Sequence, residues 1–328
     1  MNKTKADKVN VYAYLTPDPL DEDSTVETEW MEWIPGFNAQ EDEDGSHPFF
    51  RDENIALFKA IELTTVSHFR KSLRNLSVLL TNHLFDHIQI AIDHLGIVSR
   101  DTSVASYDYG NSQPEMGKYV MHASRSLMSA YIKAGHDLTK LSPYTAVTWE
   151  HEIIHLLDHW EVVKSCVYKF SALAINKFTY YLLSYRNEGL ADLFYLLNGR
   201  YHEVNSIEAA KTAFDSAVQR VQHKMLEKDM TDDEWNQEIF SEMDCYEAGP
   251  WLMLDLLRSF EGCWHERLID EALLKISKGE PLSHLKTLAI IRIALRVKTE
   301  DFLDYIMPLV PKYKQGVHAE LLDQLVFN

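Results

Sequence analysis

The chain has 328 residues and carries 50 acidic against 32 basic residues, a formal net charge of -18 at pH 7. Such a charge repels phosphate backbones and anionic lipid surfaces, so we expect neither nucleic acid nor a membrane as a partner. Hydrophobic residues make up 46% of the chain, which is enough to fill the core of one large domain or two modest ones.

The cysteines and the N-terminus bear on the compartment. Cys166, Cys245 and Cys263 show no CxxC spacing and are odd in number, which argues against a disulfide framework and against a cysteine zinc site. The N-terminus has lysines but no apolar run of signal-peptide length, and no later segment is apolar enough to span a bilayer. We expect a soluble cytoplasmic protein; a protein secreted without a signal would share these features.

The first region, residues 1–53, crowds acidic residues around proline and glycine, as in DPLDEDSTVETEWMEW and QEDEDGSHP. We expect an acidic, partly extended N-terminal region. A solvated surface is the ordinary role of such a segment, and a lid, an inhibitory segment or a tail that docks a protein partner are the alternatives.

The second region, residues 54–205, begins with apolar residues at intervals of three and four from Asn54 to about Gly96, which predicts helices that bury one face. KYVMHAS, residues 118–124, is the expected strand. The third region, residues 206–328, is again periodic at helical spacing and is broken by Gly249-Pro250 and by later glycines and prolines. The pattern predicts an α+β, mainly helical fold with a small sheet and a helical C-terminal subdomain.

The segment SPYTAVTWEHEIIHLLDHWE predicts a helix that starts near Ser142 and Pro143. His151 and His155 stand one turn apart on it, so both imidazoles can reach one metal ion. Zinc in catalytic sites takes three protein ligands and a water. Glu152 would lie beside that water and could take its proton. Two surface histidines on an ordinary helix are the alternative. The apolar stripe on nearly the opposite side consists of Trp149, Ile153, Leu156 and Trp160.

The segment YRNEGLADLFYLLNG offers the third ligand. Glu188 and Asp192 are four residues apart and share a helical face, and Gly199 is the expected C-terminal stop. Glu188 could bind the metal while Asp192 accepts the N–H of a ligand histidine and orients its ring. A ligand ten residues after the first histidine, at Glu161, is disfavoured because no helix breaker precedes it.

HEIIH followed by NEGLAD resembles the gluzincin metallopeptidases, the thermolysin-like and aminopeptidase-N-like branch of the peptidase MA superfamily. The Asn-Glu-x-x-Ser-Asp element of the thermolysin-like enzymes is matched by Asn187, Glu188 and Asp192, with Ala191 in place of the serine. The resemblance implies a zincin-like catalytic core. It also implies roles for single residues: zinc ligands His151, His155 and Glu188, general base Glu152, and orienting residues Asp192 and Asn187.

A second element, CYEAGPWLMLDLL, resembles the Tyr-x-x-Gly element that opens a helix in the aminopeptidase-N-like enzymes, whose tyrosine stabilises the oxyanion of the tetrahedral intermediate. Tyr246 and Gly249 match it; an ordinary tyrosine before a helix start is the other interpretation. No Gly-x-Met-Glu-Asn element is present, so aminopeptidase activity is not implied. KYVMHAS lies where zincins place the edge strand that pairs with substrate, and an internal strand is equally open.

The sequence therefore predicts zinc-dependent hydrolysis of a peptide or protein substrate, with Glu152 as general base, Tyr246 at the oxyanion and Zn²⁺ as cofactor. The C-terminal subdomain would complete the cleft. Two alternatives belong to other classes. One is a catalytically inactive zincin-like binding or regulatory protein, and the other is a helical protein in which the motif arose by chance.

Overall fold

The computed structural model describes residues 5–15, 52–80, 85–92, 104–164, 177–199, 204–227, 231, 245–260 and 263–311. The chain forms two compact units, Met1–His159 and Trp160–Asn328. Most of the acidic region predicted at residues 1–53 lies outside the described residues. The domain boundaries expected near residues 54 and 206 stay a prediction.

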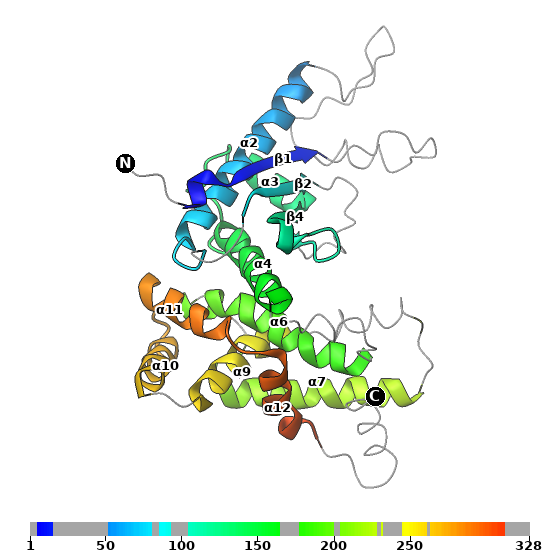
Figure 1. Cartoon of the computed structure of the whole chain (residues 1–328), viewed down its shortest axis with the longest axis vertical. Coiled ribbons are helices and arrows are strands. Elements are labelled where there is room, and N and C mark those ends of the chain that lie inside the picture. Colours follow the sequence, from blue (N-terminus) through cyan, green and yellow to red (C-terminus); the bar gives the residue numbers. More distant parts are fainter. Residues whose placement is uncertain are drawn as a thin grey trace. The chain divides into compact units, whose positions relative to one another are not determined.

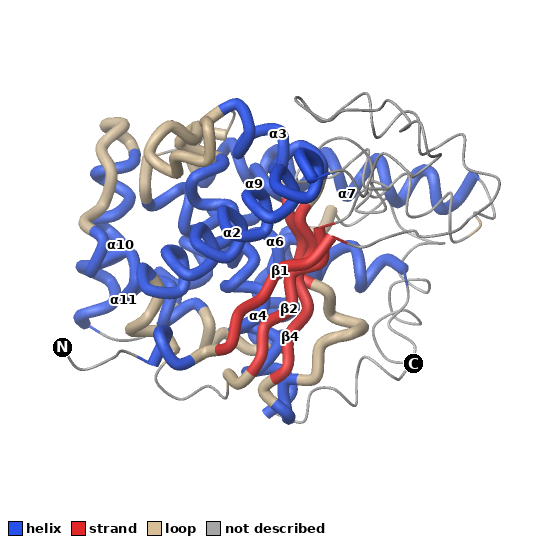
Figure 2. Tube along the Cα trace, turned by 90° about the horizontal axis from the view of Figure 1, so that it is seen from above, coloured by secondary structure: helices blue, strands red, loops and turns tan. Residues whose placement is uncertain are grey.

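The first unit contains a four-stranded sheet of order β1-β2-β4-β3, built from β1 (Asn10–Leu15), β2 (His87–Ile92), β3 (Ala105–Tyr107) and β4 (Lys118–Ala123). β1, β2 and β4 are parallel neighbours (Figure 2), and β3 is antiparallel to β4. The strand predicted at KYVMHAS is confirmed as β4. It lies between β2 and β3, so of the two interpretations of this strand the internal one holds.

Alternating side chains divide the sheet into two faces. Buried residues such as Ile88, Ile90 and Met121 point to one face, while His87 and Lys118 are exposed on the other. Helix α2 (Asp52–Asn75) of this unit packs on β1 (Figure 1), and helix α3 (Arg125–Lys133) contacts α2. Short 3-10 turns lie at η1 (Lys5–Lys8) and η3 (Pro114–Met116).

The helical prediction from Asn54 to about Gly96 was right only for its first part. α2 ends at Asn75, and residues 87–92 form strand β2. The sequence HIQIAI places isoleucine at every second position, which is the period of a strand. Six residues, four of them apolar, are too few to distinguish this period from a helical one, and the prediction of a helix here was wrong.

The HEIIH segment is helical, as predicted, but it starts later than Ser142. The Ser142 hydroxyl accepts a hydrogen bond from the Thr145 N–H at 3.1 Å, at the start of the single 3-10 turn η4 (Thr145–Val147), whose N-cap residue is Tyr144. The α-helix that carries the motif is α4 (Thr148–Lys164), which follows directly. Ser142 and Pro143 therefore open the turn that leads into α4, not α4 itself.

In its described part, the second unit consists of helices. They are α6 (Lys177–Leu197), α7 (Ile207–Glu227), α9 (Cys245–Ser259), α10 (Cys263–Ile276), α11 (His284–Ala294), α12 (Thr299–Ile306) and the 3-10 turn η5 (Met307–Leu309). α6 packs most extensively on α9, and α7 packs on α9 as well (Figure 1).

The ends and interior of these helices test two predictions. The predicted stop at Gly199 is confirmed, because α6 ends at Leu197 and Gly199 adopts a left-handed conformation with a φ of 68°. The predicted break at Gly249-Pro250 is wrong, because α9 continues through both residues. Pro250 is the sixth residue of α9, and because proline has no N–H it cannot donate the hydrogen bond that this position would otherwise make within the helix.

The protein is mainly helical and has one small mixed sheet in its described part, which is the coarse α+β class expected from the sequence. Among the described helices, none combines the length and apolarity required to cross a membrane.

Candidate metal centre

Helix α4 is buried on nearly all sides. Trp149, Ile153 and Leu156, the described members of the predicted apolar stripe, have no exposed surface, and Ile154 and Leu157 are equally buried. Between residues 148 and 159, His151 is the one residue that is not buried. A helix buried this completely cannot carry unsatisfied polar side chains cheaply, so the partners of its histidines and glutamates are informative.

The two motif histidines face each other. Their Nε2 atoms lie 3.0 Å apart, and their ring centroids lie 4.7 Å apart with the rings nearly perpendicular. Two nitrogens bound to one tetrahedral zinc at about 2.05 Å would lie about 3.3 Å apart. The pair therefore already has close to the separation that a shared metal ion requires.

Glu152 is buried, with 5% of its surface exposed, and one of its carboxylate oxygens lies 3.9 Å from His151 Nε2. Its carboxylate is therefore on the same side of α4 as the nitrogen pair. A carboxylate at this place can accept a proton from a water molecule held near the two nitrogens.

Glu150 has a different environment. Ser72 Oγ and Asn75 Nδ2, both on α2, donate hydrogen bonds to its two carboxylate oxygens at 2.6 and 2.8 Å. Burial raises the pKa of Glu150, and these two hydrogen bonds only partly offset that effect. Glu150 thus ties α4 to α2 and is the structural counterpart of Glu152.

A buried hydrogen-bonded chain holds the start of α4. Trp149 Nε1 donates to the Tyr131 hydroxyl at 3.2 Å, and this hydroxyl lies 3.0 Å from His68 Nδ1. His68 Nε2 lies 3.1 Å from the Ala146 carbonyl, which can only accept, so Nε2 carries the proton. Burial lowers the pKa of His68 to about 4, and His68 is neutral near pH 7.

Two tyrosines that the sequence analysis did not single out contact the histidines of α4. The Tyr109 hydroxyl lies 3.1 Å from His155 Nδ1, and the Tyr107 hydroxyl lies 2.7 Å from His159 Nδ1. His159 is buried, so it belongs to the polar interior and not to the surface. The Tyr-x-Tyr alternation in SYDYG, which places both rings on one side of an extended segment, was the available signal.

In the second unit, α6 carries Asn187 and Glu188 as half-exposed residues in a stretch, 184–197, that is otherwise buried. The apolar residues of this part of the helix are all buried: Leu190, Leu193, Phe194 and Leu197. Glu188 is therefore partly exposed on a helix whose neighbouring residues are mostly buried, while Asp192, one turn further on, is buried.

Helices α6 and α9 touch through glycine. A Cβ atom placed on Gly189 would lie 2.4 Å from the carbonyl carbon of Gly249, and one placed on Gly249 would lie 2.7 Å from Gly189 Cα. The first turn of α9 is thereby held beside the Glu188 turn of α6. Burial raises the pKa of Cys245 in that first turn, and the charges of Glu188 and Asp192 raise it further.

The residues predicted to form the site are thus distributed over two units. His151, Glu152 and His155 lie together on α4 in the first unit. Asn187, Glu188 and Asp192 lie on α6 in the second unit, and Tyr246, which is 41% exposed, lies in the first turn of α9. No protein-family model matches the chain, and comparisons with curated proteins and with solved structures gave no match either.

Proposed function

We propose that the protein is a zinc-dependent peptidase of gluzincin type, in which His151, His155 and Glu188 bind the metal ion. The observation that carries the proposal is the arrangement on α4. Two imidazole nitrogens lie 3.0 Å apart, and a buried carboxylate stands next to them. Two imidazoles and a carboxylate form one of the donor sets that hold catalytic zinc and leave a position for water.

The surroundings of Glu152 favour a chemical role over a purely structural one. Either a proton or a metal ion can bridge two imidazole nitrogens at 3.0 Å, so the histidine pair alone would also fit an ordinary buried helix. Glu152 follows His151 directly in the chain, and its buried carboxylate lies 3.9 Å from His151 Nε2, on the side of α4 that the nitrogen pair occupies. This placement, within reach of a water molecule held near the two nitrogens, supports the assignment.

The chemistry follows from the residue types. When bound, zinc supplies a Lewis acid that polarises a carbonyl group and acidifies a water ligand. Glu152 takes a proton from the attacking water and later passes it to the leaving amine. Tyr246 donates a hydrogen bond to the oxygen on which negative charge develops. Asp192 and Asn187 orient the ligands, because a hydrogen bond to the far nitrogen of a ligand histidine sets its tautomer.

The proposal is tested by metal content. Elemental mass spectrometry of the purified protein should find about one zinc per chain, and His151→Ala and Glu188→Ala should each abolish it. His87→Ala is the matched control, because His87 is exposed on the sheet and is not a proposed ligand; this variant should keep its zinc.

Activity is measured on the same preparations with a peptide library, with and without a chelator. Hydrolysis that the chelator abolishes and added zinc restores is the expected result. If the protein contains zinc but hydrolyses no peptide, the function is that of a zinc-binding regulatory protein and not of an enzyme. A wild-type protein that neither contains zinc nor takes it up on titration would end the proposal.

A further inference from the structure

We propose that Tyr109 is a positioning residue that fixes the ring of His155 for metal binding, and that a turn clamped to β4 by Asp108 holds Tyr109 in place. This inference rests on the zinc site proposed above. It adds to that site a residue from a part of the chain that the motif does not include.

The contact is made to the nitrogen that points away from His151. Tyr109 Oη lies 3.1 Å from His155 Nδ1, while His155 Nε2 lies 3.0 Å from His151 Nε2. A histidine that binds a metal ion through Nε2 carries its proton on Nδ1 and needs an acceptor there. The phenol oxygen of Tyr109 is in place to accept a hydrogen bond from that N–H, and in this arrangement Nε2 is free of the proton and offers its lone pair to the metal ion.

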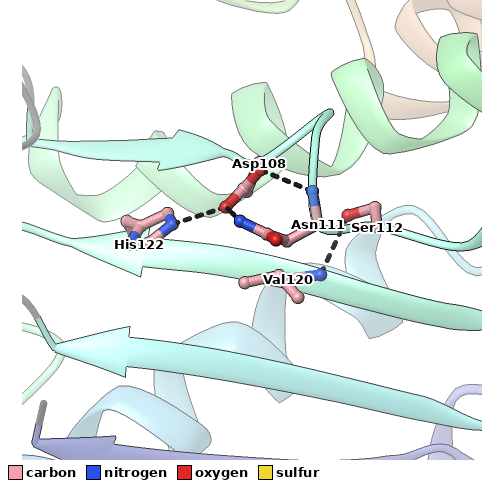
Figure 3. Close-up of polar contacts among 5 residues, drawn as sticks. All are labelled: Asp108, Asn111, Ser112, Val120 and His122. Atoms are coloured by element: carbon pink, nitrogen blue, oxygen red, sulfur yellow. Dashed lines mark hydrogen bonds and ion pairs between the residues drawn. The ribbon is translucent and has the colours of Figure 1, made fainter.

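The turn that carries Tyr109 is tied to β4 through Asp108. The Asp108 carboxylate accepts hydrogen bonds from the Asn111 N–H at 2.9 Å, from Asn111 Nδ2 at 2.8 Å and from His122 Nε2 at 3.0 Å. Asn111 and His122 both point toward Asp108 (Figure 3). The Val120 N–H donates to Ser112 Oγ at 3.0 Å, which gives the turn a second attachment to the same strand.

Charge strengthens this clamp. Partial burial by itself would raise the pKa of Asp108, but the hydrogen bonds from His122 and Asn111 outweigh it, and the pKa of Asp108 lies below its ordinary value. Asp108 is therefore ionised at neutral pH and acts as an acceptor only. Tyr107 is the last residue of β3 and Tyr109 lies in the turn that follows, so the contacts that hold Asp108 toward β4 fix the position of this turn and of the Tyr109 ring that it carries.

The chain offers its own control in Tyr107. Its hydroxyl makes the same kind of contact, 2.7 Å to His159 Nδ1, but His159 is not a proposed ligand. The rings of Tyr107 and Tyr109 also touch, with centroids 4.7 Å apart. Tyr109→Phe and Tyr107→Phe therefore remove one hydroxyl each from one aromatic cluster, and only the first acts on the metal.

The experiment is a chelator competition that measures the zinc dissociation constant of the full chain, together with the visible absorption of the Co²⁺-loaded protein. Tyr109→Phe should weaken zinc binding about 10- to 100-fold and shift the Co²⁺ bands. Tyr107→Phe should change neither, and thermal unfolding of metal-free Tyr109→Phe should match that of the wild type. Asp108→Ala should also weaken zinc binding, because it releases the turn.

Each other outcome is decisive. If the wild type binds zinc and Tyr109→Phe binds it equally well, the positioning role is overturned and the zinc site stands. If both tyrosine variants lose affinity equally, the effect belongs to packing of the turn and the role assigned to Tyr109 is overturned. If Asp108→Ala binds as well as the wild type, the clamp is overturned. If the wild type binds neither Zn²⁺ nor Co²⁺, this inference and the proposed function fall together.

Discussion

Helices α4 and α6 are both largely buried, and His151 on α4 and Glu188 on α6 are each partly exposed, but different contacts hold the two helices. Polar contacts hold α4: Trp149 through Tyr131 to His68, Glu150 to Ser72 and Asn75, and His155 to Tyr109. Backbone contact through Gly189 and Gly249 holds α6 against α9. The difference teaches that a helix with many polar residues can belong to the core when most of them have hydrogen-bond partners, although the buried Thr148 Oγ1 of α4 has none among the described residues.

Hydrogen bonds to titratable groups depend on pH, whereas a contact between backbone atoms does not. The stability that the polar contacts of α4 contribute should therefore change on acidification. The stability that depends on the glycine contact of α6 should not.

The largest expected effect separates the two glutamates of α4. Glu152→Gln should lower peptide hydrolysis by about 10²- to 10⁴-fold, because an amide cannot accept the proton of the attacking water. Zinc content should stay at the wild-type level. Glu150→Gln is the matched control. It makes the same change two residues earlier on the same helix, at a residue whose carboxylate accepts hydrogen bonds from α2.

Hydrolysis rates and metal content of the two variants, measured side by side, decide the roles. Glu150→Gln should keep its turnover and lose only folding stability. Full activity in Glu152→Gln would remove Glu152 from the mechanism, and a greater loss in Glu150→Gln would reverse the two assignments.

The second effect tests the polar support of α4 through His68. Its pKa is lowered from 6.5 to about 4 by burial, so between these two pH values the unfolded chain binds a proton that the folded protein does not. Stability therefore rises with pH across this window and is lost as the pH falls through it. The loss attributable to His68 should reach about 3 kcal/mol near pH 4.

The measurement is the free energy of unfolding from pH 7 to pH 4 for the wild type and for His68→Gln. The variant starts lower but should lose about 3 kcal/mol less than the wild type over this range. Glu150 and the other acids are present in both proteins, so their titration cancels in the comparison. Parallel curves for the two proteins would show that His68 does not sense acid in the folded state.

The parts of the structure that could be predicted are those that depend on residues close together in the sequence. The helices of HEIIH and NEGLAD follow from apolar spacing, and the end of α6 follows from a glycine that tolerates a positive φ. β4 was also predicted, because KYVMHA alternates. Strand β2 was missed, because six mostly apolar residues fit either period and only pairing with β1 and β4 makes them a strand.

The supports of the candidate site could not be predicted, because they join residues far apart in the sequence. Tyr109 is 46 residues from His155, and His68 is 63 residues from Tyr131. A tyrosine in a polar turn looks like any other until the turn is folded against α4. The motif identified candidate ligands on α4, but the residues that hold them belong to tertiary structure alone.

The smallest effect tests the backbone contact of α6. In an ordinary helix, replacing glycine by alanine stabilises the fold by about 0.5–1 kcal/mol. At Gly189 the sign should reverse, because the new methyl group would lie within 2.4–2.7 Å of Gly249 backbone atoms and would push α6 and α9 apart. We expect Gly189→Ala to destabilise the protein by about 1–3 kcal/mol, equally at pH 7 and pH 5.

Gly110→Ala is the control for this last prediction, because its methyl group would meet Asp108 at an ordinary 3.5 Å. Urea unfolding at both pH values, with hydrogen exchange of peptides from α6 and α9, measures the size and the place of the effect. A destabilisation that grows on acidification would mean that a titrating group shares the contact, and the division between the polar support of α4 and the backbone support of α6 would then fail. A stabilised Gly189→Ala would mean that the two helices separate at little cost, and that glycine at this crossing is not required to hold the first turn of α9 beside Glu188.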